Sequence, residues 1–115
     1  SGWLGENAKD RAGLILISAA SHDAIIFSSG LPMKRFIHEG TGAYWTAATE
    51  IPDHYARWIV MRTYSDDDQT WRLVSKTVGF GRYERVKQYP FADIYQLKDE
   101  YLKDLDPSPN FGAQK

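Results

Sequence analysis

The stretch that decides the fold is Leu14-Ile15-Leu16-Ile17-Ser18-Ala19-Ala20, in which Ser18 is the only polar residue. A short apolar run without polar alternation is typical of a strand covered on both faces, as in a parallel sheet. The segment 57–62, Arg-Trp-Ile-Val-Met-Arg, is the next clearest strand, and the segment 34–40 supplies another between the two. The sequence therefore predicts three strands in these segments.

Helical patterns alternate with these strands. A short helix is expected within residues 3–12, and a second is expected to begin at Ser21 or Asp23 and to end at Gly30. Residues 41–51 predict a further helix that Pro52 interrupts. The acidic residues 65–68 favour a helix start, followed by an apolar stripe of Trp71, Leu73, Val74 and Val78.

Residues 83–97 predict two strands around a turn at Tyr89-Pro90, because apolar and polar residues alternate on both sides of it. The order of elements favours an α/β fold: a layered, mostly parallel sheet with helices on both faces and a C-terminal antiparallel hairpin. Residues 1–106 are expected to form a single domain. The segment 107–115, which begins Pro-Ser-Pro-Asn, predicts a disordered tail.

Composition excludes several function classes. The 115 residues include 14 basic and 15 acidic ones, for a net charge of -1, so nucleic acid is not expected as a partner. The chain has no cysteine, which excludes disulfides and thiolate chemistry. No apolar run approaches the roughly 18 residues that a membrane-spanning helix needs. The start at Ser1-Gly2 without methionine indicates a processed tag or an excised fragment.

In open α/β sheets, ligands bind beyond the carboxyl ends of the strands. The three predicted strands end beside polar residues, including two of the three histidines in the chain, each next to a carboxylate. We therefore expect a binding surface at this edge. The candidate binding residues are Ser21, His22, Asp23, His38, Glu39, Thr41 and Arg62.

Several interpretations compete for these residues. Histidine and carboxylate can bind zinc, but no HxxxH or HxH spacing places two ligands on one element, so no metal site is expected. Consecutive Ser21, His22 and Asp23 are poorly placed for a catalytic triad, since the base must reach the nucleophile through space. The structural alternative is that Ser21 and Asp23 cap a helix while the histidines bond to loop backbone.

Three other features carry weaker signals. Gly40-Thr41-Gly42 could offer N–H groups to an anion, but a tight turn explains the same glycines. Asp66-Asp67-Asp68 lacks the spacing of a calcium loop and fits a helix N-terminus. Lys34-Arg35 could meet a lipid phosphate, although two charges are fewer than the four or so that such a patch normally has.

Four stretches resemble the soluble C-terminal domain of prokaryotic multi-spanning glycosyltransferases similar to the dolichyl-phosphate-mannose protein mannosyltransferases. The likeness covers roughly residues 13–97. It lies in the general succession of residue types and includes no signature motif. The stretches that carry it are 15–32, from Ile-Leu-Ile-Ser to Gly-Leu-Pro; 34–45, from Lys-Arg-Phe to Tyr-Trp; 56–62, Ala-Arg-Trp-Ile-Val-Met-Arg; and 91–95, Phe-Ala-Asp-Ile-Tyr.

The resemblance implies a function for the larger protein. Such enzymes move a sugar from a polyprenyl-phosphate donor to an acceptor on the outer side of the membrane, with catalytic acidic residues in a loop among the membrane helices. It implies no catalytic residue and no cofactor in this chain. The partners would be the membrane-embedded part of the same polypeptide and a glycan or protein acceptor, at the extracytoplasmic face of the cell membrane.

Two other functions remain open on the residues alone. One is a small free-standing hydrolase in which His22 or His38 acts as general base. The other is a protein-interaction module that binds through an edge strand. The hydrolase requires a concave pocket with a nucleophile within hydrogen-bond reach of a histidine.

Overall fold

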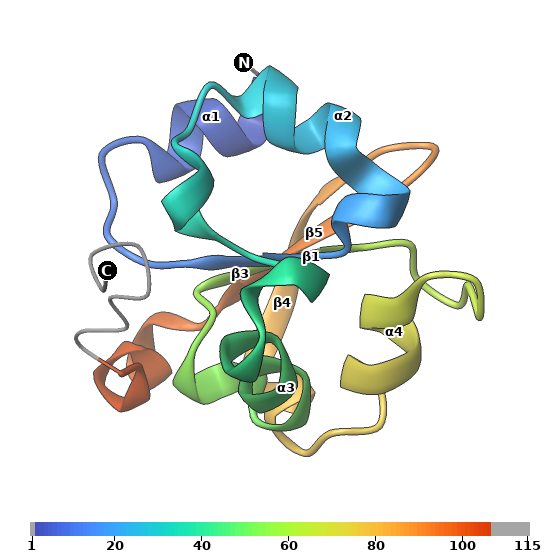
Figure 1. The fold of residues 1–115 in the computed structure, drawn as a ribbon. Helices are drawn as coiled ribbons and strands as arrows, with labels where there is room; N and C mark the ends of the chain where they lie inside the picture. The colour runs from blue at the N-terminus through green and yellow to red at the C-terminus, as the bar shows by residue number, and fades with distance from the viewer. Residues whose placement is uncertain (1, 107–115) are drawn as a thin grey trace.

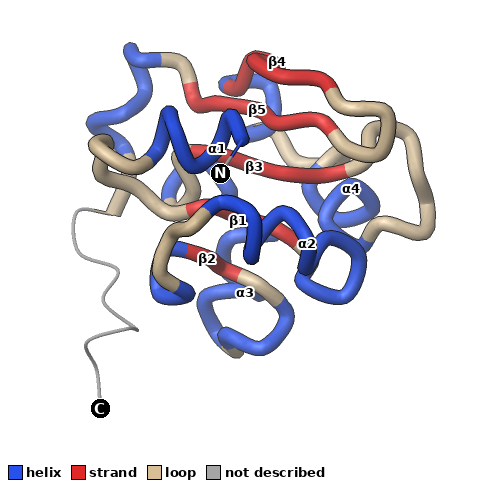
Figure 2. The backbone as a smooth tube through the Cα atoms, turned by 90° about the horizontal axis from the view of Figure 1, so that it is seen from above, coloured by secondary structure: helices blue, strands red, loops and turns tan. Residues whose placement is uncertain are grey.

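Strand β1 (Ile15–Ile17) is an inner strand of the sheet in the computed structural model, which describes residues 2–106. It pairs in parallel with β2 (Phe36–Ile37) on one side and with β3 (Trp58–Met61) on the other. Strand β5 (Asp93–Leu97) runs antiparallel to β3, and β4 (Tyr83–Gln88) runs antiparallel to β5. The sheet order is β2-β1-β3-β5-β4 (Figure 2). A mixed sheet combined with helices confirms the expected α/β class.

Helices cover both faces of this sheet (Figure 1). On one face lie α1 (Gly2–Ala8) and α2 (Ala19–Ser29), and on the other lie α3 (Ala43–Glu50) and α4 (Gln69–Val74). Short 3-10 segments connect the larger elements, at Met33–Arg35, Glu39–Thr41, Pro52–His54, Gly79–Arg82 and Asp99–Asp104. Within residues 2–106, no helix combines the length and the hydrophobicity needed to cross a bilayer.

The core explains why residues 14–17 are apolar without interruption. Successive strand side chains point to opposite faces, so Ile15 and Ile17 pack toward α1 and α2, whereas Leu16 packs with the residues under α3 and α4. All three are fully buried. Burying one such side chain is worth about 1.5–3 kcal/mol. A polar residue at any of these positions would face a core, because helices cover both sides of the strand.

Two expected helices differ from the observed ones. The first helix ends at Ala8 and leaves residues 9–13 as a loop. Helix α4 ends at Val74, so the expected apolar stripe is wrong at Val78, which lies beyond the helix and is 95% exposed. Leu73 lies inside the helix but is 42% exposed. Hydrophobicity at helical spacing was therefore insufficient to extend this helix. The tail expected at residues 107–115 lies outside the described residues.

Hydrogen bonds from the Arg35 side chain connect the loop before β1 to the start of β2. Its Nε donates to the carbonyl of Gly13 at 2.8 Å, and its Nη2 donates to the carbonyls of Ala8 at 3.1 Å and Arg11 at 2.9 Å. Arg57 supports the same loop through Nη1, which donates to the carbonyl of Ala12 at 2.8 Å. The two arginines thus satisfy carbonyl groups of loop 9–13 and the last carbonyl of α1.

Replacing Arg35 with alanine is expected to lower the free energy of unfolding by about 2–3 kcal/mol, because hydrogen bonds to charged groups are each worth about 1.5–3 kcal/mol. The measurement is urea denaturation followed by circular dichroism. The neighbouring exposed Lys34→Ala is the matched control and should change stability by less than about 0.5 kcal/mol. Equal effects of the two variants would contradict this account of Arg35.

Candidate functional site

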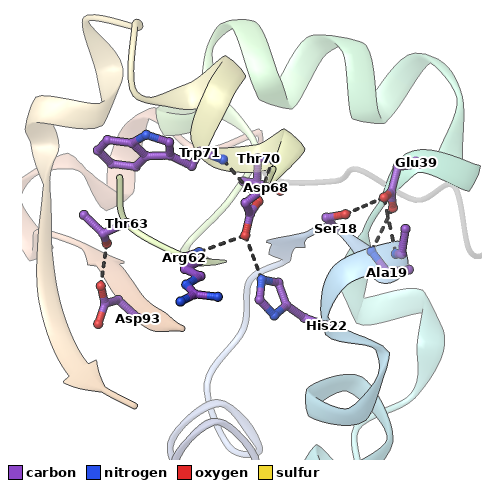
Figure 3. A network of polar contacts seen from close by, with 11 residues as sticks. Ser18, Ala19, His22, Glu39, Arg62, Thr63, Asp68, Thr70, Trp71 and Asp93 are labelled. Atoms are coloured by element: carbon purple, nitrogen blue, oxygen red, sulfur yellow. Dashed lines mark hydrogen bonds and ion pairs between the residues drawn. The ribbon is translucent and has the colours of Figure 1, made fainter. Parts of the chain in front are cut away.

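The carboxyl ends of the three parallel strands meet at one edge of the sheet, here called the rim. In the register, Leu16 lies beside Ile37 and Ile17 beside Val60, so β1, β2 and β3 end close together. The loops that follow place Ser18, Glu39 and Arg62 at this edge (Figure 3). The geometry is the one that makes such edges ligand sites in open α/β sheets.

Glu39 joins the loop after β2 to the start of α2. Its Oε2 accepts from the Ser18 hydroxyl at 2.5 Å and from the Ala20 N–H at 3.3 Å, and its Oε1 accepts from the Ala19 N–H at 2.8 Å. This carboxylate satisfies the first N–H groups of the helix, which have no partner inside it. The expectation that Ser21 or Asp23 caps this helix is wrong, because α2 begins earlier, at Ala19, and takes its acceptor from the distant Glu39.

Asp68 joins three elements at the rim. Its Oδ2 lies 2.7 Å from Nε2 of His22 and accepts from the N–H of Arg62 at 2.8 Å. Its Oδ1 accepts from the N–H groups of Thr70 at 2.9 Å and Trp71 at 3.3 Å. Asp68 is therefore the N-cap of α4, as the acidic run indicated, and it also ties α4 to the end of β3 and to α2.

Hydrogen bonding sets the charge state of both carboxylates. Burial acts to raise the pKa of Asp68, but the bonds from His22, Arg62 and Trp71 outweigh burial and leave the pKa below its ordinary value. Burial likewise acts to raise the pKa of Glu39, and the Ser18 hydroxyl together with backbone N–H groups lowers it below the ordinary value. Both side chains are consequently held as anions inside their hydrogen-bond sets.

A third group of polar contacts, at the carboxyl end of β3 and the start of β5, was not anticipated. The Thr63 hydroxyl donates to Oδ2 of Asp93 at 2.5 Å and lies 2.6 Å from the Tyr95 hydroxyl. Arg85 on β4 approaches the same carboxylate, with Nη1 at 3.7 Å from Oδ2. The alternation that placed Asp93 and Tyr95 on one face of a strand was the available signal, but it did not reveal which loop they contact.

The remaining sequence candidates do not join this network through their side chains. His38 accepts from the N–H of Gly40 through Nδ1 at 3.0 Å, and Thr41 donates to the carbonyl of His38 at 2.8 Å. The interpretation that the histidines bond to loop backbone is thus confirmed for His38 and is wrong for His22, which bonds to Asp68.

Gly42 has a φ of 64°, which supports the interpretation of residues 40–42 as a turn. The side chains of Ser21, Asp23 and Arg62 are exposed.

Backbone strain occurs near Asp68. Tyr64 has a φ of 65°, a left-handed conformation that is costly for a bulky residue, and its ring packs edge-on against Trp71. His22 interrupts the helical backbone of α2, with φ -135° and ψ 36°. Tyr64 lies in the loop between β3 and α4, and Asp68 accepts from the N–H groups of Arg62 and Trp71 on either side of it. These contacts help to fix the loop in which the strained Tyr64 conformation occurs.

The described part of the rim places no nucleophile and no group of metal ligands beside His22. His22 is 8% exposed, and its ring is hydrogen-bonded to Asp68 with no serine, threonine or tyrosine hydroxyl bonded to it among the described residues. No three histidine or acidic side chains of residues 2–106 are grouped to hold a metal ion. Two hollows in the surface of the described chain lie elsewhere, away from His22 and Glu39.

The pKa of Asp68 predicts a pH-dependent stability. Because the folded-state pKa is below the ordinary value near 4, the stabilisation is complete above that value and is lost as the pH falls through the folded-state pKa. Asp68→Asn is expected to lower the free energy of unfolding by about 3 kcal/mol at neutral pH, as for other broken buried pairs. In urea titrations, the deficit relative to wild type should shrink below about pH 4.

The exposed neighbour supplies the control for this experiment. Asp67→Asn makes the same chemical change one residue away and should alter stability by less than about 0.5 kcal/mol. A deficit in Asp68→Asn that stays constant from neutral to acidic pH would show that the charge of Asp68 is not what stabilises the rim.

Comparison with known proteins finds no family model, no curated protein and no solved structure that matches this chain. The likeness to glycosyltransferase domains therefore stands on the sequence stretches alone, and the fold and the contacts at the rim are the observations on which a function must be argued.

Proposed function

We propose that the chain is a non-catalytic accessory domain of a membrane glycosyltransferase that uses a polyprenyl-phosphate sugar donor. In this role it contributes to acceptor recognition or to the stability of the larger protein, at the extracytoplasmic face of the membrane. The observation that supports a non-catalytic role is the hydrogen bonding within the rim. His22, Glu39 and Asp68 all have hydrogen-bond partners inside the protein.

Internal bonding of this kind occupies Nε2 of His22 and both carboxylate oxygens of Glu39 and of Asp68. A catalytic base must come within hydrogen-bond reach of the proton that it removes. His22 presents Nε2 to Asp68 and is nearly buried, and Glu39 is occupied by the start of α2. Their arrangement instead gives the rim a fixed shape, which favours recognition by the exposed side chains beside it, Ser21, Asp23 and Arg62.

The resemblance supplies the rest of the proposal. It places the catalytic acids among membrane helices of the same polypeptide and makes that membrane-embedded part the main partner. The finer architecture, a layered and mostly parallel sheet with a C-terminal antiparallel hairpin, follows instead from the order of elements in the sequence. The parallel pairings of β1 with β2 and β3, and the antiparallel pairing of β4 with β5, support that architecture.

One observation favours a second candidate, a small hydrolase. A histidine held by a carboxylate, as His22 is held by Asp68, is the arrangement that orients a general base in hydrolases. The missing element is a nucleophile, since the described residues place no hydroxyl on the His22 ring. Activity assays therefore separate the two candidates.

The purified chain is expected to transfer no sugar from a polyprenyl-phosphate donor to an acceptor peptide and to hydrolyse esters and phosphoesters at background rates. His22→Ala is the matched variant. Turnover above background that disappears in His22→Ala would establish the hydrolase, whereas sugar transfer by the chain alone would refute an accessory role.

A second test of the accessory role examines the complete gene that encodes this chain. The complete reading frame is expected to encode several long apolar segments before the region of this chain, and removal of this region should reduce sugar transfer by the full protein. A full reading frame without such segments would contradict the proposal, whatever the result of the hydrolase assays.

A further inference from the structure

The edge opposite the rim carries a cationic hollow of about 810 Å³. It forms where β1, β2 and β3 begin, because Leu14, Arg35 and Arg57 line it and each directly precedes one of these strands. Loop 9–13 and the segment Asp99–Asp104 both lie on this side of the molecule (Figure 1). The cationic residues that line it are Lys9, Arg11, Arg35, Arg57 and Lys103, against the acidic residues Asp10 and Asp106.

Basic and acidic residues are unevenly distributed around the hollow, although the chain as a whole is nearly neutral. Five of the 14 basic residues line the hollow, but only two of the 15 acidic ones do. Among residues 2–106, the salt bridges involve none of the five cations. Besides Asp10 and Asp106 in the lining, Asp99 acts on Arg57 electrostatically without a salt bridge.

Three arginines lie close enough to repel one another. Burial, and then the charge of Arg57, lower the pKa of Arg35 below its ordinary value. Burial and the charge of Arg11 lower the pKa of Arg57 in the same way, against the opposite effect of Asp99. A guanidinium stays protonated even so, and a group of like charges without a counter-ion is stabilised when an anion binds.

The two inner arginines are also held in place. Nε and Nη2 of Arg35 and Nη1 of Arg57 donate to neutral backbone carbonyls, which orient each guanidinium without cancelling its charge. The hydrogen bonds leave Nη1 of Arg35 and Nη2 of Arg57 with no partner among the described residues. Guanidinium groups are preferred donors for phosphate, and each of these two nitrogens could donate to a phosphate oxygen.

The lining of the hollow is also partly apolar. Leu14, Tyr55, Leu102 and Leu105 line it together with the cations. A ligand that matches both features has an anionic group for the arginines and an apolar or sugar-like body for the apolar side chains. Phosphate esters combine these properties, either as soluble compounds or as the headgroups of lipids.

We infer that the hollow between loop 9–13 and the segment Asp99–Asp104 is a phosphate-ester binding site, in which Arg11, Arg35 and Arg57 hold the phosphate and Lys103 closes the edge. The site lies across the sheet from the rim, so it is separate from the surface on which the proposed function rests. It would be present whether or not the chain belongs to a glycosyltransferase.

The test compares two double variants of the full chain with identical changes in charge. Arg11→Ala/Lys103→Ala removes two exposed cations from the hollow, and Arg72→Ala/Lys76→Ala removes two exposed cations from helix α4 and the residues after it. Neither Arg11 nor Lys103 makes a side-chain hydrogen bond or salt bridge among the described residues, so the first variant should fold. Circular dichroism and the midpoint of thermal unfolding verify this for both.

In the first arm, inorganic phosphate is titrated against each protein at constant ionic strength and followed by amide NMR shifts. Saturable shifts are expected at residues 9–14, 35 and 57. The affinity should fall about tenfold or more in the Arg11/Lys103 variant and stay unchanged in the Arg72/Lys76 variant. Constant ionic strength matters because salt screens exposed charges over about 10 Å.

In the second arm, flotation measures binding to phosphatidylcholine vesicles with and without phosphatidic acid. Binding that needs phosphatidic acid and is lost in the Arg11/Lys103 variant identifies a lipid headgroup, and phosphate binding without vesicle binding identifies a soluble ester. The inference is overturned if neither probe binds the wild-type chain, if both double variants lose binding equally, or if the shifts map away from the hollow.

Discussion

The parallel pairing of β1 with both β2 and β3 is the constraint on which the rest of the structure depends. Three neighbouring strands that run the same way give the domain two chemically different edges. At the carboxyl ends, helices and turns begin and present N–H groups; at the amino ends, the preceding loops present carbonyl groups. Carboxylates therefore suit one edge and guanidinium groups suit the other.

The side chains follow this polarity. Glu39 and Asp68 accept from the N–H groups that open α2 and α4, at the carboxyl edge. Arg35 and Arg57 donate to the carbonyls of the loop before β1, at the amino edge. In a chain with a net charge of -1, the acidic side chains Glu39 and Asp68 thus lie at one end of the parallel strands, and the basic side chains Arg35 and Arg57 lie at the other. The overall composition conceals this separation because the two edges cancel in the sum.

The sequence was informative where local rules decide the structure. An uninterrupted apolar run identified β1, and an acidic run before an apolar segment identified Asp68 as a helix cap. It was misleading where a distant partner replaces a local one. Ser21 and Asp23 are polar residues close to the start of α2 in sequence, yet Glu39, 20 residues away from Ala19, supplies the acceptor. His22 and Asp68 are 46 residues apart, and no spacing rule connects them.

The cationic hollow was missed for the same reason, since the residues that line it come from four separate segments of the chain.

The two edges also differ in what remains available to a ligand. A carboxylate that accepts several N–H bonds, as Asp68 does, has its charge compensated inside the protein and its pKa lowered accordingly. A guanidinium that donates to neutral carbonyls, as Arg35 does, is fixed in position but keeps its full charge. Its neighbours Arg57 and Arg11 add to that charge, and no salt bridge within residues 2–106 opposes it. The internal bonds that make the rim rigid also compensate its charge, so the stronger residual field lies at the edge opposite His22.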